Sequence, residues 1–218
     1  NIINSIILPA KQNSNVHLLD VDMGSDTNRT VVTFVGKPTD VIKVAFECIK
    51  LASKLIDMSK HKGEHPRMGA TDVCPLIPVK NVSMNECISL SKDLARKVSN
   101  ELNIPIFLYE NSASNKKRKS LSYIRSGQYE GFSQKFTKKE WRPDYGKAEL
   151  NVKSGVTAIG AREFLIAYNI NLNTQNKKIA TDIALDIRES GRAKRDKDGS
   201  ILRDSNGKMI KKKGKFNF

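Results

Sequence analysis

Residues 61–75 concentrate the side chains of this chain that are best suited to proton transfer. Two of the three histidines, His61 and His65, lie here with Arg67, two carboxylates, two glycines and two prolines. An imidazole accepts and returns a proton near neutral pH because its unperturbed pKa is about 6.5. Catalytic groups are common on loops held between rigid elements. The segment therefore predicts general acid–base chemistry.

The neighbouring residues suggest how one histidine would work. Pro66 would stiffen the backbone beside His65, and Arg67 could hold a carboxylate or stabilise a developing anion. A carboxylate could orient the imidazole, and the candidates are Asp72, Asp20 and Asp22.

Other interpretations of the segment stay open. His61 and His65 are four residues apart and could bind zinc, but Gly63 and Pro66 disfavour a helix here, and the order His-Glu-x-x-His is absent. We therefore expect no metal. The histidines could also bond to backbone carbonyls in a purely structural loop. Cys74 is a weak candidate nucleophile because it lies in a strand pattern, where a buried thiol is common.

Hydrophobic periodicity and local signals predict the elements that must hold this loop. A stripe of apolar residues follows Pro38 with helical spacing, and Ser83 with Glu86 forms a capping box before a second helix. Prolines in the strand that follows the loop predict an edge strand. The expected order is a short helix at 2–8, strands at 16–21 and 29–36, a helix from 38, a strand at 73–79, a helix at 83–102, strands at 105–109, 155–161 and 164–172, and a helix at 174–191.

This order predicts an α+β fold. We expect a ferredoxin-like split βαβ sandwich with a mixed or antiparallel sheet and helices packed on one face. Residues 111–153 show only a weak pattern and are expected to form a long functional loop or short turns. Asp198-Gly199 and Asn206-Gly207 are two hairpin-turn signals near the end of the chain.

The net charge of +15 is unevenly distributed. Residues 192–215 hold ten Lys or Arg against three Asp, a surplus of seven. A solvated tail or hairpin is the expected explanation, and nucleic-acid binding is not expected because no aromatic stacking motif accompanies the basic runs. No apolar run approaches the ~20 residues that span a bilayer, so we expect no membrane partner. The odd number of cysteines, Cys48, Cys74 and Cys87, favours a reducing compartment and hence the cytoplasm.

Residues 61–79 resemble the signature of the glutamate formimidoyltransferase family. The resemblance extends to residues 19–22, 28–31, 34–36 and 83–87, and to 160–172, so that it covers nearly the whole chain up to Gly191. It implies the N-terminal subdomain of a bacterial-type member, with residues 1–172 as that subdomain and 173–218 as the start of a second one that carries a basic hairpin. The family's opening strand and the rest of the second subdomain have no counterpart here, so we expect a chain truncated at both ends.

The resemblance also implies an activity. The family transfers the formimino group of N-formimino-L-glutamate to N5 of tetrahydrofolate in histidine degradation. One proton must leave N5 and one must reach the departing glutamate amine, and the resemblance assigns both transfers to His65. It places Arg67 and Asp22 in the same site. It assigns folate binding to Gly146, Lys147, Ala148, Glu149, Leu150, Asn151, Val152, Lys153, Ser154 and Gly155.

Partners follow from the same resemblance. Tetrahydrofolate is expected as a co-substrate, including its polyglutamylated forms, together with a homodimeric assembly and a cyclodeaminase as a partner. Because both substrates carry carboxylates, a basic cleft would concentrate them and would account for part of the positive charge. The alternative function is a non-catalytic folate-binding or interaction module derived from this family.

Overall fold

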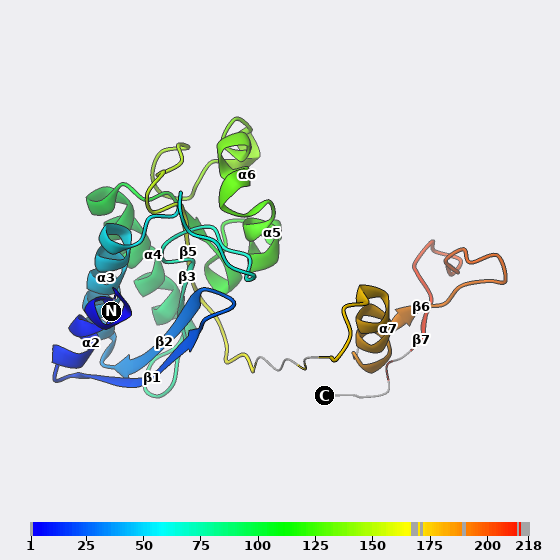
Figure 1. The fold of residues 1–218 in the computed structure, drawn as a ribbon, viewed down its shortest axis with the longest axis horizontal. Helices are drawn as coiled ribbons and strands as arrows, with labels where there is room; N and C mark the ends of the chain where they lie inside the picture. The colour runs from blue at the N-terminus through cyan, green and yellow to red at the C-terminus, as the bar shows by residue number, and fades with distance from the viewer. Residues whose placement is uncertain (1, 167–169, 171, 189–190, 213, 215–218) are drawn as a thin grey trace. The chain divides into compact units, whose positions relative to one another are not determined.

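The computed structural model describes residues 2–166, 170, 172–188, 191–212 and 214 (Figure 1). The chain divides into two compact units, Asn1–Leu165 and Ile166–Phe218, which are described separately. The first unit contains α1 (Ile2–Ile6), α2 (Leu8–Gln12), β1 (Val16–Gly24), β2 (Arg29–Gly36), α3 (Pro38–Leu55), β3 (Val73–Leu76), α4 (Met84–Leu102), β4 (Ile106–Leu108), α5 (Leu121–Arg125), α6 (Gln128–Lys135) and β5 (Thr157–Ala161). Three 3₁₀ turns, Glu110–Ser112, Lys116–Lys119 and Lys139–Trp141, complete it.

β1 and β2 form the predicted antiparallel hairpin. A bulge between Leu18 and Asp20 shifts the register, after which Asp22 lies opposite Val31. Phe34 packs against α3 in the core. Because side chains alternate along a strand, Asp22 projects from the opposite face of the hairpin to Phe34. Asp22 is exposed there.

The second sheet is parallel, with the strand order β3-β5-β4. β3 is an edge strand, as Pro75 predicted. The α+β class is therefore confirmed. The strands divide into an antiparallel pair and a parallel three-stranded sheet, whereas a ferredoxin-like sandwich keeps its strands in one sheet.

The two long helices cover one face of the parallel sheet. α3 begins with Pro38 in its first turn, and α4 begins at the predicted capping box, in which Ser83 and Glu86 exchange both hydrogen bonds. Ile106 and Leu108 of β4 point into the core beneath these helices. Both helices have nearly the bounds that the apolar periodicity predicts.

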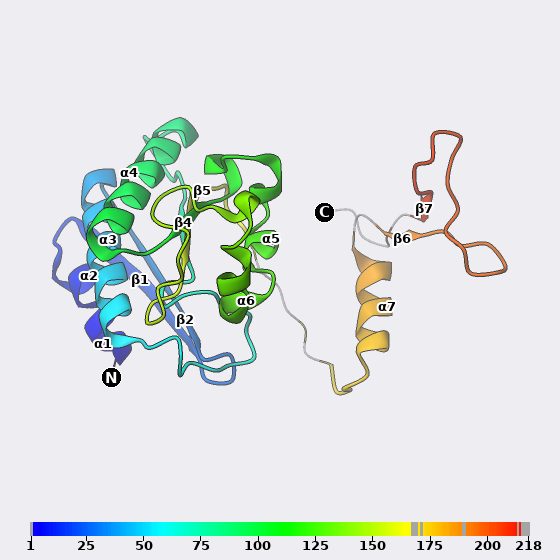
Figure 2. The same cartoon turned by 90° about the horizontal axis from the view of Figure 1, so that it is seen from above.

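A second layer covers the other face of the sheet, so the expectation of helices on one face only was incomplete (Figure 2). Phe107 of β4 packs there against Phe132 of α6 and Trp141, and Ile124 of α5 lies in the same cluster. Of the two expectations for residues 111–153, the long loop is wrong and the short turns are closer, because short helices and 3₁₀ turns here carry aromatic residues into this second core. The sequence pattern missed this layer because its helices are short and its apolar residues are widely spaced.

The second unit contains α7 (Lys177–Ile187), β6 (Arg192–Ala193) and β7 (Lys211–Lys212). Both hairpin-turn predictions are confirmed, since Gly199 and Gly207 have positive φ angles and isolated bridges flank the turns. The strand predicted at 164–172 is wrong for its described residues, 164–166, 170 and 172, because none of them lies in a strand. Its remaining residues, and residues 189 and 190 of the predicted last helix, lie outside the described part of the chain. No helix among the described residues has the length and apolar character that crossing a bilayer demands.

Candidate active site

The loop between α3 and β3 is anchored on the tip of the β1–β2 hairpin. The Glu64 N–H donates to the Asp26 carbonyl at 3.2 Å. Asn28 makes two contacts: its side-chain amide donates to the Lys62 carbonyl at 2.6 Å, and its own carbonyl lies 2.9 Å from Nε2 of His61. These bonds fix one side of the loop.

His61 and His65 differ in their partners. The Asn28 carbonyl can only accept, so His61 donates from Nε2 and is the carbonyl-bonded histidine that the structural interpretation of the loop describes. Nδ1 is buried without a hydrogen-bond partner among the described residues in both histidines, so this atom does not distinguish them. The difference is that the hairpin holds the Nε2 atom of His61, whereas no described residue of the hairpin bonds to the ring of His65.

The surroundings of His65 favour its neutral form. Burial is the largest cause that lowers its pKa, and the positive charge of Arg29 is the second. Arg125 acts in the same direction, while the Pro66 backbone and Asp72 act in the opposite one. A neutral imidazole at neutral pH can accept a proton, which is the state that a general base needs.

Arg67 ties the loop to α6. Its guanidinium forms an ion pair with Glu130 at 2.6 Å and also donates to the side chain of Gln128 and to the His61 carbonyl. The Arg67 carbonyl accepts from the Tyr129 N–H at 2.8 Å. The carboxylate that Arg67 holds in this structure is therefore that of Glu130, and the hydrogen bonds to Glu130 raise the pKa of Arg67.

Asp72 closes the other side of the loop. Its Oδ1 accepts from the Met68 N–H at 2.8 Å, and its Oδ2 forms an ion pair with Arg125, whose side chain is 15% exposed. Arg125 lies in the weakly patterned region 111–153, so no sequence signal pointed to it. Arg29 falls within residues 28–31, which belong to the family resemblance. Arg29 directly follows Asn28, a position that could have indicated its proximity to the loop.

Asp22 lies on the hairpin that carries Asp26 and Asn28. Within the described part of the chain, the hydrogen bonds and ion pairs of the loop that come from this hairpin involve Asp26 and Asn28, and none involves Asp22. Asp22 is the one predicted catalytic residue that the polar contacts do not join to the loop.

The segment 146–155 divides into two parts. Gly146, Lys147 and residues 149–151 line a cavity of about 540 Å³ beside the end of α4, together with Ser99, Asn100, Asn103 and Pro105. Residues 153 and 154 contact the loop between α3 and β3, residues 56–72, which we call the His65 loop. The Lys153 carbonyl accepts from the Met58 N–H at 2.8 Å, and the Ser154 carbonyl accepts from the Ala70 N–H at 2.9 Å. The segment thus connects the cavity to the loop, although His65 is not among the residues that line the cavity.

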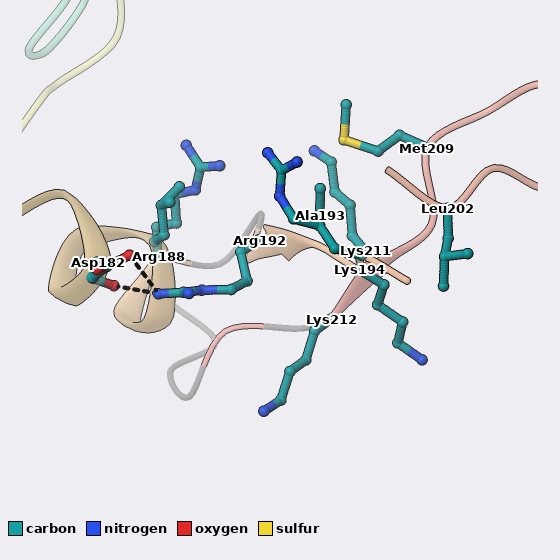
Figure 3. Close-up of a pocket in the computed structure, with 11 residues that line it drawn as sticks. Asp182, Arg188, Arg192, Ala193, Lys194, Leu202, Met209, Lys211 and Lys212 are labelled. Atoms are coloured by element: carbon teal, nitrogen blue, oxygen red, sulfur yellow. Dashed lines mark hydrogen bonds and ion pairs between the residues drawn. The ribbon is translucent and has the colours of Figure 1, made fainter. Parts of the chain in front are cut away.

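The second unit holds a separate cavity of about 760 Å³ between α7 and the hairpins (Figure 3). Its lining is strongly cationic, and Arg192 is paired there with Asp182 and Asp186. None of the predicted site residues lines it. The cationic members of the lining are Arg188, Arg192, Lys194, Arg195, Lys211 and Lys212.

The three cysteines are poor candidates for nucleophilic chemistry. Cys48, Cys74 and Cys87 are unpaired. Burial raises the pKa of Cys74 to about 12, which keeps its thiol protonated at neutral pH and makes it a poor nucleophile. No group of three or more His, Cys, Asp or Glu in the described ranges is arranged to hold a metal ion.

Comparison with known proteins agrees with this geometry. The chain is 47% identical over 190 residues to the glutamate formimidoyltransferase of Streptococcus pyogenes serotype M1, covering 87% of this chain and 64% of that protein. It is 49% identical over 193 residues to the formimidoyltransferase-cyclodeaminase of Mus musculus, covering 88% of this chain and 36% of that protein. The chain thus spans about one third to two thirds of the length of these relatives.

The match to a protein family covers most of the chain. Residues 1–162 match the formiminotransferase domain, N-terminal subdomain. The match includes the hairpin, the His65 loop, and the segment 146–155. The chain belongs to the formiminotransferase N-terminal subdomain family.

Proposed function

We propose that this chain acts in glutamate formimidoyl transfer, moving the formimino group of N-formimino-L-glutamate to N5 of tetrahydrofolate in histidine degradation. The family and the names of the relatives support this proposal. The observation that carries it is the position of His65 on a loop anchored at both sides, where burial and the charge of Arg29 lower its pKa.

His65 is proposed to carry both protons of the reaction. The neutral ring accepts the proton that the attacking amine loses, and the resulting imidazolium returns a proton to the glutamate nitrogen as it departs. Each such transfer typically contributes 10²–10⁴-fold to the rate. Pro66 restricts the backbone next to the ring, and Arg67 keeps the loop against α6. Asp22 is proposed to act in the same site from the exposed face of the hairpin.

Residues 146–155 are proposed to bind tetrahydrofolate. Small-molecule sites usually occupy about 300–1,000 Å³, and the cavity beside α4 lies within that range. Its lining combines apolar surface with amides of Asn100, Asn103 and Asn151, which suit a polar heterocycle. Because the segment continues into contact with the His65 loop, a pterin bound along it would approach the proton carrier.

The wider organisation is proposed from the relatives. Residues 1–172 would form the first formiminotransferase subdomain, and 173–218 would begin the second, which would supply further contacts to a polyglutamylated folate. A cyclodeaminase partner is proposed because several relatives are named formimidoyltransferase-cyclodeaminase. A homodimer is proposed from the family resemblance alone. The three unpaired cysteines support a cytoplasmic location.

A turnover assay tests the function. The full polypeptide is incubated with N-formimino-L-glutamate and tetrahydrofolate, and free glutamate is measured. We expect His65→Ala to lose at least a hundredfold in kcat, whereas His17→Ala, an exposed histidine of β1, retains full activity. Unchanged turnover in His65→Ala would reject the mechanism. Folate binding without turnover by the unmodified chain would instead support the non-catalytic folate-binding module.

A further inference from the structure

Arg29 carries a charge that the fold does not use. It begins β2 and is exposed, and its guanidinium makes no hydrogen bond or ion pair with any other described residue. Three other arginines of the first unit behave differently, since each pairs with a carboxylate: Arg67 with Glu130, Arg118 with Asp144 and Arg125 with Asp72. Those three arginines are largely buried, whereas Arg29 is exposed, so its charge is free to bind a ligand.

The hairpin tip brings this charge to the proton carrier. Asn28, the residue before Arg29, is bonded to the His65 loop through its side chain and its carbonyl. Arg29 exerts the strongest charge effect on His65, ahead of Arg125. Asp72 already balances the charge of Arg125, whereas no carboxylate of the described residues pairs with Arg29.

The proposed reaction places an anion at the same point. In N-formimino-L-glutamate, the nitrogen that must receive a proton from His65 is bonded to the carbon that bears the α-carboxylate. Guanidinium groups bind carboxylates with two parallel hydrogen bonds, and such pairs are among the strongest that side chains form. A group that binds the α-carboxylate must therefore lie close to the ring of His65.

We infer that Arg29 binds the α-carboxylate of the formimino donor beside His65. This inference rests on the proposed function. Binding of the donor would also change the pKa of His65. A carboxylate bound to Arg29 neutralises its charge and so removes the repulsion that disfavours the protonated form of His65. Donor binding would therefore make His65 a stronger base at the moment when a proton must be accepted.

Binding measured by NMR on the 218-residue chain tests the inference without turnover. The chain has three histidines, so the ring signals of His65 can be assigned by comparison with His65→Gln. We expect Arg29→Ala to weaken N-formimino-L-glutamate binding by about 10–100-fold, as for the loss of a charged hydrogen-bond partner, and Arg29→Lys to weaken it less. Arg96→Ala, which removes an exposed arginine of α4, serves as the matched control and should bind normally.

Two amide analogues of the donor identify the carboxylate. The α-amide of N-formimino-glutamate should bind the unmodified chain with the same low affinity that the unmodified donor has for Arg29→Ala. The affinity of the α-amide should not fall further in Arg29→Ala. The γ-amide should keep the full dependence on Arg29. Saturation with the acid should raise the pKa of His65, and this rise should be absent in Arg29→Ala.

The outcomes separate this inference from the proposed function. Equal affinities of the unmodified chain and Arg29→Ala overturn the inference, as does a dependence on Arg29 that disappears with the γ-amide. Arg29-dependent binding without formimino transfer supports the inference and rejects the proposed function. Transfer at an unchanged KM in Arg29→Ala rejects the inference alone. An unchanged urea midpoint of Arg29→Ala confirms that the variant folds.

Discussion

Gly69 and Gly155 pair across an isolated antiparallel bridge that joins the His65 loop to the proposed folate segment. The two backbones approach so closely that neither position has room for a side chain. A Cβ at Gly155 would clash with the Met68 carbonyl oxygen, and one at Gly69 would clash with the Val156 carbonyl oxygen. The Val156 N–H donates to the same Met68 carbonyl at 3.0 Å, so the backbone there cannot move aside without losing a hydrogen bond.

We expect Gly155→Ala to destabilise the first unit by about 3–4 kcal/mol, because it adds this clash to the strain of a positive φ. Gly127→Ala is the matched control: its φ is +73°, close to the +69° of Gly155, but its Cβ would meet nothing nearer than 3.5 Å. That variant should cost only about 1 kcal/mol. Urea unfolding followed by Trp141 fluorescence measures both, and equal losses would show that the close approach contributes nothing.

The ion pair between Arg118 and Asp144 should be important for stability. Their side chains are only 7% and 9% exposed, and Asp144 also accepts from the Leu108 N–H. Asp144→Ala would leave a buried guanidinium uncompensated, which typically costs about 3–5 kcal/mol. The exposed pair of Arg96 and Asp93 provides the comparison, and Asp93→Ala should change the free energy of unfolding by about 1 kcal/mol or less. A loss in Asp144→Ala as small as in Asp93→Ala would contradict the prediction.

The pH dependence of His65 has a definite sign. Burial and Arg29 lower its pKa in the folded chain below the usual 6.5. As the pH falls, the unfolded chain therefore becomes protonated at this histidine at a higher pH than the folded chain. The contribution of His65 to stability is therefore complete above about pH 6.5 and declines as the pH falls below that value. If His65 is the base, the acid limb of kcat/KM should also lie below pH 6.5.

Variants of the charged neighbours should move this pKa in opposite directions. Arg29→Ala and Arg125→Met remove positive charge and should raise the pKa of His65, whereas Asp72→Asn removes negative charge and should lower it. NMR titration of the free chain measures each shift. The same direction of shift in Arg29→Ala and Asp72→Asn would show that these charges do not act on the ring.

The cysteines should resist alkylation in the folded chain. Burial raises the pKa of Cys74 to about 12 and that of Cys48 to about 11, so few thiolates are present at pH 8. We expect Cys74 to react on the order of a thousandfold more slowly with iodoacetamide than in the urea-unfolded chain. Mass spectrometry of the labelled peptides gives the rate at each cysteine. Rapid labelling of Cys74 in the folded chain would revive it as a candidate nucleophile.

Local patterns predicted much of the first unit. The helices α3 and α4, the capping box of Ser83 and Glu86, and the β1–β2 hairpin follow from periodicities and signals that each lie within a few residues. The strand order β3-β5-β4 and the aromatic layer of Phe107 and Trp141 could not be predicted from local patterns. They depend on which surfaces remain uncovered once the long helices have packed, and residues from the whole chain determine those surfaces.

The sequence by itself determined the α+β class, the family resemblance, and the concentration of titratable groups at 61–75. Only the tertiary structure decided which histidine is held by the hairpin: the Asn28 carbonyl bonds to Nε2 of His61, whereas no described residue of the hairpin bonds to the ring of His65. It also brought Arg125 to Asp72, 53 residues away in sequence, and gave Arg29 no carboxylate partner within the described ranges. The physical reason is that a side chain's partner and pKa depend on neighbours brought close by packing, and residue types along the chain do not specify those neighbours.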